Sequence, residues 1–285
     1  MKKGLILEGG AMRGMFSAGV MDVMMENGIE YDGAIGVSAG ALFGCNYKSR
    51  QMGRTFRYNL RYCNDKRFIG LYALITDGNI VSKNFAYGEI PLKYDKFDIK
   101  AYENNPMEFW IVTTDIETGE AYYHRCDSFD EHGFEWFRAS GSLPLVSQIV
   151  EIDDKKYLDG SIADPVPLEF FETQGYDRNV AVLTQPRGFR KDSSDNNPLI
   201  KRMYKDYPNL LETLDKRMQV YNEQRELLER REKEGDLFII APNEPLKIKR
   251  LDRDMEAIVE AYHQGRDATL ERLDEMKEYL GIRSD

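Results

Sequence analysis

A serine between two glycines is the first feature of this chain that could carry chemistry. The stretch "YDGAIGVSAGALFG", residues 31–44, places Ser38 where a short apolar run ends and a run of small residues begins. A sharp strand-to-helix turn exposes a serine hydroxyl as a nucleophile, and such a crowded turn needs glycine on each side, here Gly36 and Gly40. The same pattern also occurs in ordinary turns. Because a strand precedes it and a helix follows it, we interpret Ser38 as a candidate nucleophile.

A second glycine-rich turn lies upstream, in "LILEGGAMRGMF", residues 5–16. Three interpretations compete: an oxyanion hole, a tight turn with close helix packing, and a nucleotide or phosphate site. The spacing departs from the dinucleotide pattern GxGxxG, and the next strand does not end in an acidic residue. An oxyanion hole fits better, because backbone N–H groups beside a serine turn would bind the oxyanion. The residues that suit it are Gly9, Gly10, Gly14 and, as a fixed positive charge, Arg13.

The base that would activate the serine must be a histidine or a carboxylate. The three histidines suit a strand, a loop and a charged helix face better than a catalytic pocket: His124, His132 and His263. Too few residues precede Ser38 for the α/β-hydrolase topology that carries a Ser-acid-His triad. An aspartate can serve instead if burial raises its pKa and it touches the hydroxyl. The candidate is Asp159, which follows an apolar strand and precedes Gly160; a plain Asp-Gly turn is the alternative.

Apolar runs that suit strands alternate with helical patterns, which indicates an α/β fold with a mainly parallel sheet. The predicted strands are 4–8, 34–37, 109–116, 180–184 and 236–241, with a hairpin at 147–160 that turns at Asp153 and Asp154. The predicted helices are 12–26, 39–52, 200–234 and 252–280. We assign the charged helix 200–234 a role in packing or self-association and no catalytic role.

Together the motifs "GGAMRG", "GVSAG" and "DGS", in this order, closely resemble the patatin-like phospholipase family. The resemblance continues in "RASGSLPLV" at 138–146, "ADPVPLE" at 163–169 and "DLFIIAP" at 236–242, and so covers nearly the whole chain; it is closest to bacterial, cytoplasmic-type members. It implies a three-layer α/β/α sandwich, a Ser-Asp dyad without histidine, and hydrolysis of fatty acyl esters without metal or cofactor. By this resemblance Ser38 is the nucleophile, Asp159 is the base, and the oxyanion loop is matched by Gly9, Gly10, Arg13 and Gly14.

Two residues depart from the family pattern. Ala11 stands where a third glycine is usual; it keeps its backbone N–H, so the oxyanion hole forms if an ordinary negative φ suffices there. Ser161 follows Gly160 where glycine or alanine is usual. A hydrogen bond from Ser161 would lower the pKa of Asp159 and make it a weaker base.

The chain has 285 residues, of which 42% are hydrophobic, enough for one large core or two modest domains. We expect a catalytic α/β domain at 1–186 and a flexible loop at 187–198, where "RGFRKDSSDNNP" is polar. A helical region with one strand, 199–285, is expected to pack on the catalytic domain. The absence of a long apolar stretch predicts a cytoplasmic protein.

The formal charge of −10 argues against nucleic acid as a partner and confines any membrane-surface contact to a local, transient one. Segment 54–75 interleaves arginines with aromatic side chains, which suits either a lipid headgroup site or paired arginines beside core aromatics. The favoured substrate is a lipid or another acyl ester, as for a phospholipase A or lysophospholipase. The alternatives are an esterase or thioesterase for soluble acyl compounds and a catalytically silent lipid-binding protein. No feature of the sequence specifies an oligomeric state.

Overall fold

One mixed, mostly parallel sheet organises the computed structural model, which describes residues 1–129, 132–192 and 197–282. The strand order is β5-β6-β3-β2-β1-β7-β8, with β4 also paired to β3. The parallel strands are β1 (Lys2–Leu7), β2 (Gly33–Val37), β3 (Glu108–Asp115), β7 (Tyr176–Val182) and β8 (Leu237–Ile240). The antiparallel strands at one side are β4 (Ala121–Arg125), β5 (Val150–Ile152) and β6 (Lys155–Asp159).

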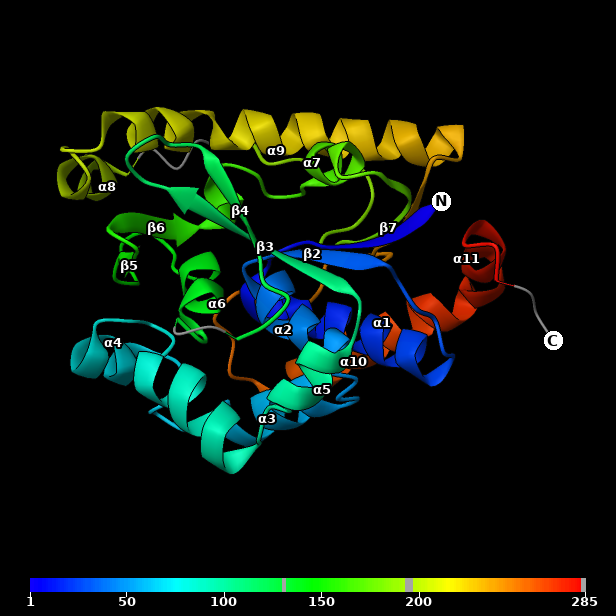
Figure 1. Ribbon diagram of the computed structural model, residues 1–285. Coiled ribbons are helices and arrows are strands. Elements are labelled where there is room, and N and C mark those ends of the chain that lie inside the picture. The colour runs from blue at the N-terminus through cyan, green and yellow to red at the C-terminus, as the bar shows by residue number, and fades with distance from the viewer. Residues whose placement is uncertain (130–131, 193–196, 283–285) are drawn as a thin grey trace.

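Helices cover both faces of the sheet (Figure 1). Leu5 and Leu7 pack into a core with the first helical layer, whereas Ile6 packs into a separate core with the second. The first layer includes α1 (Gly14–Glu26), α2 (Ala39–Lys48), α6 (Glu135–Ser140), α10 (Met255–Glu271) and α11 (Leu273–Tyr279). The second includes α7 (Leu168–Thr173) and α9 (Pro208–Glu234). Successive strand residues are therefore buried on opposite faces, which confirms the predicted three-layer α/β/α sandwich.

The hairpin before Asp159 turns where the sequence predicted. Asp153 and Asp154 both have positive φ, 50° and 61°, and the two residues that flank them, Ile152 and Lys155, are paired. This is the geometry of a two-residue hairpin loop, which aspartate tolerates better than most side chains do. The hairpin thus delivers the end of β6 to the middle of the sheet, beside β3.

The long C-terminal helices are broken where the sequence analysis expected them to be continuous. The predicted helix 200–234 consists of α8 (Pro198–Met203) and α9, because Pro208 starts a new helix and cannot continue an old one. The predicted helix 252–280 divides into α10 and α11 at Arg272. The predicted loop 187–198 includes residues 193–196, which lie outside the described residues.

Between β2 and β3 the chain makes a helical excursion that the sequence analysis did not resolve into elements. It contains α3 (Arg54–Tyr62), α4 (Leu71–Asp77), the π-helix η2 (Phe85–Tyr94) and α5 (Ile99–Asn104). Arg54 is buried and donates to Asn46 and to the backbone oxygen of Asp95, and Arg57 forms a bidentate pair with the Asp95 carboxylate. Two of the arginines of 54–75 are therefore structural, as the simpler interpretation held.

Helices α1 and α10 cross at two glycines, and this contact ties the C-terminal region to the start of the chain. A Cβ added at Gly19 would lie 2.0 Å from the backbone oxygen of Tyr262, and one added at Gly265 would lie 2.0 Å from that of Phe16. The Tyr262 hydroxyl also donates to Asp22 across this contact. The two backbones can therefore approach this closely only because neither glycine has a side chain.

We expect Gly265→Ala to lower the midpoint of thermal unfolding, because its methyl group must push α10 away from α1. The cost should be about 1–3 kcal/mol, as for other overpacked positions. Gly88→Ala is the matched control, since a Cβ there would lie 3.9 Å from its nearest neighbour. Calorimetry of the two variants and the wild type decides; equal midpoints for Gly265→Ala and the wild type would show that the crossing is not rigid.

Candidate active site

Ser38 occupies a strained turn between the end of β2 and the start of α2. Its backbone has φ 54° and ψ −123°, a conformation that non-glycine residues rarely adopt. The neighbouring glycines allow the turn to pack closely. A Cβ at Gly36 would lie 2.4 Å from the backbone nitrogen of Ala41, and one at Gly40 would lie 2.1 Å from the backbone oxygen of Leu7. No larger residue fits at either position without moving the backbone.

Ser140, which the sequence analysis did not single out, anchors this turn. The backbone N–H of Ser38 donates to Ser140 Oγ at 2.8 Å, and the Ser140 hydroxyl donates to the backbone oxygen of Val112 at 2.6 Å. Ser140 is completely buried at the end of α6. It belongs to the segment "RASGSLPLV", 138–146, which resembles the family but whose sequence alone indicates no role for this serine. Its contact links the Ser38 turn to β3.

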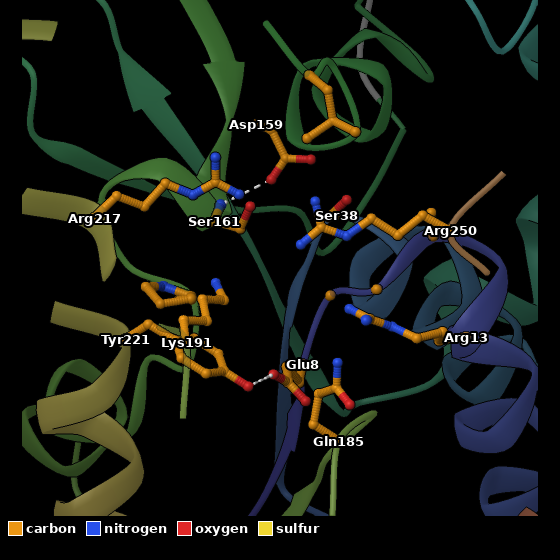
Figure 2. A pocket seen from close by; sticks show the side chains of 15 residues that line it. Glu8, Arg13, Ser38, Asp159, Ser161, Gln185, Lys191, Arg217, Tyr221 and Arg250 are labelled. Atoms are coloured by element: carbon orange, nitrogen blue, oxygen red, sulfur yellow. Dashed lines mark hydrogen bonds between the residues drawn. The ribbon is translucent and has the colours of Figure 1, made fainter. Parts of the chain in front are cut away.

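Asp159 ends β6, is completely buried, and shares the wall of one cleft with Ser38 (Figure 2). Its Oδ1 accepts a hydrogen bond from the backbone N–H of Ser161 at 2.8 Å. Its Oδ2 is buried and has no hydrogen-bond partner of standard geometry among the described residues. One oxygen of the carboxylate is thus held by the protein, and the other is left for Ser38 or a ligand.

Burial raises the pKa of Asp159 above its usual value of 3.8. The nearby Ser38 hydroxyl, the backbone and side chain of Ser161, and Arg217 all act to lower it, but burial outweighs them. Ser161 lowers the pKa of Asp159, as expected, but burial raises it by more. Ser161 makes the expected contact, yet the net shift favours a more basic carboxylate.

The glycine loop runs beside Ser38. A Cβ at Gly9 would lie 2.9 Å from Ser38 Cβ, so the loop backbone touches the serine. The backbone N–H groups of Gly9, Gly10 and Ala11 donate to no acceptor within the described part of the chain. Ala11 has φ 49°, so the negative φ that we considered for this position is not what the loop adopts. Alanine here pays a conformational penalty that glycine would avoid.

Three other predicted residues frame the loop and the base. Gly14 begins α1, where a Cβ would lie 2.7 Å from the ring of Phe43. Gly160 follows the base, where a Cβ would lie 2.3 Å from the backbone oxygen of Val112. Arg13 is half-buried and points into the cleft (Figure 2), and burial, together with Arg250, lowers its pKa. The absence of side chains at Gly14 and Gly160 therefore lets α1 and the turn after β6 pack closely against their neighbours around the cleft.

The cleft has a volume of about 510 Å³, including its open part, and most of the residues that line it are polar or charged. Beyond the predicted residues it is lined by charged and polar side chains from the C-terminal half, namely Gln185, Lys191, Arg217, Tyr221 and Arg250, and by Glu8. Arg217 and Tyr221 lie on α9, the helix to which the sequence analysis assigned no chemistry. That assignment missed them because their spacing on α9 resembles that of an ordinary packed face.

An apolar cavity of about 980 Å³, including its open part, adjoins the cleft at Ser38. Ala11, Ser38 and Leu143 line both spaces. Most of the remaining wall is apolar or aromatic and comes from α2, from the excursion between β2 and β3, and from α6; it includes Phe43, Tyr58, Phe68, Ile90, Phe97 and Phe137. Ser38 therefore stands at the boundary between a polar space and an apolar one.

The three histidines lie elsewhere in the described structure. His124 is on β4 and stacks on Trp136 with ring centroids 4.0 Å apart. His132 Nε2 lies 3.2 Å from a carboxylate oxygen of Asp153, and His263 is exposed on α10. None of the three lines the cleft.

The model of the patatin-like phospholipases matches residues 5–171, more than half of the chain. The chain belongs to the patatin-like phospholipase family. A second model, a domain of unknown function (DUF6363), matches residues 207–281. The patatin match spans the serine turn, the glycine loop and Asp159, whereas α9 and α10 belong to the second region.

The relatives of this patatin-like chain are distant. The uncharacterized protein YjjU of Escherichia coli K12 is 24% identical over 64% of this chain and 52% of its own length. Lysophospholipase NTE1 of Chaetomium globosum is 26% identical over 63% of this chain, and the match covers 12% of that protein. The match thus spans about half of the length of the first relative and about an eighth of the length of the second. Among solved structures, VipD from Legionella pneumophila aligns with 96% of this chain and 67% of its own, at 14% identity and a TM-score of 0.47.

In the part of the chain that the structure describes, no helix has both the length and the apolar character needed to cross a membrane.

We expect Ser38→Gly to unfold at a higher temperature than Ser38→Ala, because glycine removes backbone strain of about 1–3 kcal/mol at this φ. The added flexibility of glycine in the unfolded chain offsets only about 0.4–1 kcal/mol. Ser17 provides the control, since it is a buried serine inside helix α1. There the order should reverse, with glycine less stable than alanine. If the glycine variant were more stable than the alanine variant at both positions, or less stable at both, the backbone strain at Ser38 would be contradicted.

A second prediction follows from the raised pKa of Asp159. The folded protein binds this proton more tightly than the unfolded chain does, so ionisation of Asp159 costs stability once the pH rises above about 4. Asp159→Asn should therefore be more stable than the wild type at pH 7, and the difference should disappear near pH 4. Urea unfolding at both pH values measures it.

The control for that measurement is Asp164→Asn. Asp164 is also buried, but its two oxygens accept hydrogen bonds from Gln224 and Tyr123. Burial also raises the pKa of Asp164, but an amide nitrogen cannot accept the Tyr123 bond, and we expect the loss of this bond to outweigh the removed charge, so that the variant loses stability at pH 7. If Asp159→Asn lost stability as Asp164→Asn does, the result would contradict an Asp159 Oδ2 that accepts no hydrogen bond.

Proposed function

We propose that this protein is a lipid acyl hydrolase in which Ser38 is the nucleophile and Asp159 is the base. The observation that carries the proposal is the position of Ser38, which lines the polar cleft with Asp159 and also lines the apolar cavity. An ester bond at Ser38 would have its acyl chain in the cavity and its alcohol part in the cleft. A fatty acyl ester is the class of molecule with these two unlike ends.

In the first half-reaction, Ser38 Oγ attacks the ester carbonyl carbon and transfers its proton to Asp159 Oδ2. The burial that raises the pKa of Asp159 makes this transfer easier than it would be for an aspartate in water. The free Oδ2 supports this role, because it has no competing donor of standard geometry among the described residues. The proton then passes to the leaving alcohol, and an acyl-enzyme remains on Ser38.

The tetrahedral intermediate carries its negative charge on the former carbonyl oxygen. We assign the binding of this oxyanion to the backbone N–H groups of Gly9, Gly10 and Ala11. Two observations support the assignment: the loop touches Ser38, and these groups donate to no acceptor in the described chain. Arg13 adds positive charge nearby. One such donor is typically worth about 100-fold or more in rate. The N–H of Ser38 itself is not available, because it donates to Ser140.

In the second half-reaction, Asp159 takes a proton from water, and the resulting hydroxide attacks the acyl carbonyl carbon. Ser38 leaves as its alkoxide and recovers the proton from Asp159. Free fatty acid is released, and the enzyme returns to its starting state.

The apolar cavity and the relatives support a lipid as substrate. Apolar and aromatic walls bind an acyl chain by removing its methylene groups from water, at about 0.8 kcal/mol for each. The relative of Chaetomium globosum is named a lysophospholipase, and one of Drosophila melanogaster is named neuropathy target esterase sws. We therefore favour a single-chain acyl lipid of the lysophospholipid kind over a soluble acyl ester or thioester.

Hydrolysis of a p-nitrophenyl ester series and of lysophospholipid micelles, with choline and with glycerol headgroups, tests the proposal. We expect Ser38→Ala and Asp159→Asn each to lose activity, Ser38→Ala by roughly 10⁴-fold or more. Ser17→Ala and Asp164→Asn are matched controls, because both positions are buried and neither lines the cleft. Circular dichroism must show all four variants folded.

The possible outcomes separate the alternatives. Full activity in folded Ser38→Ala would refute the nucleophile assignment. Activity on soluble esters alone would favour the soluble esterase or thioesterase. A folded wild type that hydrolyses neither substrate would favour a silent lipid-binding protein.

A further inference from the structure

A group of basic side chains lines the cleft beside Ser38. Within the described ranges, four basic residues line it, and we call them the basic cluster: Arg13, Lys191, Arg217 and Arg250. Of the described residues, only two acidic ones, Glu8 and Asp159, line the same space, whereas the whole chain has 39 basic and 49 acidic residues. Figure 2 shows Lys191 and Arg217 on one side of the cleft and Arg13 and Arg250 on the other. The local charge balance is therefore the reverse of the balance of the whole chain.

Most of the basic cluster comes from outside the region that matches the patatin model, residues 5–171. Lys191 lies in the segment after β7, Arg217 on α9 and Arg250 between β8 and α10. Arg217 and Arg250 belong to residues 207–281, the region of the domain of unknown function. The C-terminal region thus provides charge beside a serine that the N-terminal region positions.

Glu8 lines the cleft together with the basic cluster, and both of its carboxylate oxygens accept hydrogen bonds from neutral groups. Glu8 Oε2 accepts from the backbone N–H and the hydroxyl of Thr184 at 2.5 and 3.1 Å, and Oε1 accepts from the Tyr221 hydroxyl at 2.8 Å. Within the described chain, the side chains of Arg13, Lys191 and Arg250 form no ion pair of 4.0 Å or less. Glu8 therefore offsets part of the positive charge of Arg13 and Lys191 from a distance and forms no ion pair with Arg13, Lys191 or Arg250.

The basic side chains disturb one another's protonation. Burial, followed by the charges of Arg217, Arg250 and Arg13, lowers the pKa of Lys191 from 10.5 to about 7, against an upward pull from Glu8. Its Nζ lies 3.7 Å from the centroid of the Tyr221 ring, which holds it in the cleft. Groups of like charge held together in this way gain stability when an anion binds among them.

We propose that the basic cluster binds the phosphate group of a lipid ester with net negative charge. The proposal rests on the proposed function for the placement of the ester bond at Ser38. The acyl chain would then lie in the apolar cavity and the phosphate in the cleft, on opposite sides of the reacting carbonyl. A choline or ethanolamine headgroup would bring its ammonium group close to four basic side chains. A phosphodiester without an ammonium group, such as that of lysophosphatidylglycerol, is therefore the preferred class.

Three substrates with the same oleoyl chain test this preference: lysophosphatidylglycerol is anionic, lysophosphatidylcholine is zwitterionic, and monooleoylglycerol is neutral. We expect the wild type to have its highest kcat/KM on lysophosphatidylglycerol. Lys191→Met and Arg250→Gln should each reduce the ratio of kcat/KM for lysophosphatidylglycerol to that for monooleoylglycerol by about tenfold, the effect of losing one charge-assisted contact. Lys249→Gln is the control, because this exposed lysine next to Arg250 does not line the cleft.

The pH dependence gives a second readout. A phosphodiester keeps its single charge around neutral pH, so a change in KM there reports the protein. KM for lysophosphatidylglycerol should rise as the pH increases through about 7, where Lys191 loses its proton. The groups that face Lys191 are Arg13, Arg217, Arg250, Glu8 and Tyr221. Lys191→Met should remove the rise; an unchanged profile in that variant would overturn the role of Lys191.

Calorimetric binding to Ser38→Ala separates this inference from the proposed function, because it needs no catalysis. We expect lysophosphatidylglycerol to bind Ser38→Ala, and the added substitution Arg250→Gln or Lys191→Met to weaken binding about tenfold. If Ser38→Ala binds lysophosphatidylglycerol but the wild type hydrolyses no ester, the hydrolase would be refuted and the anion site retained. Hydrolysis without preference among the three substrates, together with no difference in binding, would overturn the anion site and retain the hydrolase. Tighter binding of inorganic phosphate than of the lipid would overturn the lipid assignment in favour of a free-anion site.

Discussion

The backbone of Ser38 is held in a conformation that serine avoids, and the arrangement of the cleft depends on it. Such a conformation costs about 1–3 kcal/mol and persists only where the surroundings enforce it. Here α2 packs against the end of β1 through Gly40, and the Ser38 N–H is bound by Ser140, which is itself bound to β3. A relaxed turn would withdraw the hydroxyl from the boundary between the cleft and the cavity. The central strands and α6 therefore act as the support of one side chain.

The burial of Asp159 is a second feature that lowers the stability of the fold. Its strand β6 pairs with β3, so Thr113 lies opposite Asp159 and the Thr114 hydroxyl donates to its backbone oxygen. This pairing places the carboxylate in full burial with one oxygen lacking a standard hydrogen bond. A buried carboxylate of this kind destabilises the fold and gains basicity. Strain at the serine and burial at the aspartate are both features that stability alone would not select.

The two spaces that meet at Ser38 come from different parts of the chain. Much of the apolar cavity comes from α2 and from the helical excursion between β2 and β3, whereas the basic side chains of the cleft come largely from the segments after β7. The C-terminal region reaches both faces of the sheet, with α9 on one and α10 on the other, and β8 extends the sheet itself (Figure 1). Residues beyond the patatin match are thus part of the same core and of the same cleft. The family similarity by itself therefore describes only part of the cleft's surroundings.

The sequence was sufficient to predict the sheet class, the main strands, the hairpin turn and the Ser38 and Asp159 turns, because each leaves a local signal. Glycines beside a serine, an Asp-Gly after an apolar run, and alternating apolar runs are all read within about ten residues. Only the tertiary structure revealed the contact of Ser140 with Ser38, the positive φ of Ala11 and the direction of the Asp159 pKa shift. It alone also gathered the basic cluster, whose members lie up to 237 residues apart, from Arg13 to Arg250. Burial and the meeting of distant segments arise from packing over the whole chain, so no local pattern encodes them.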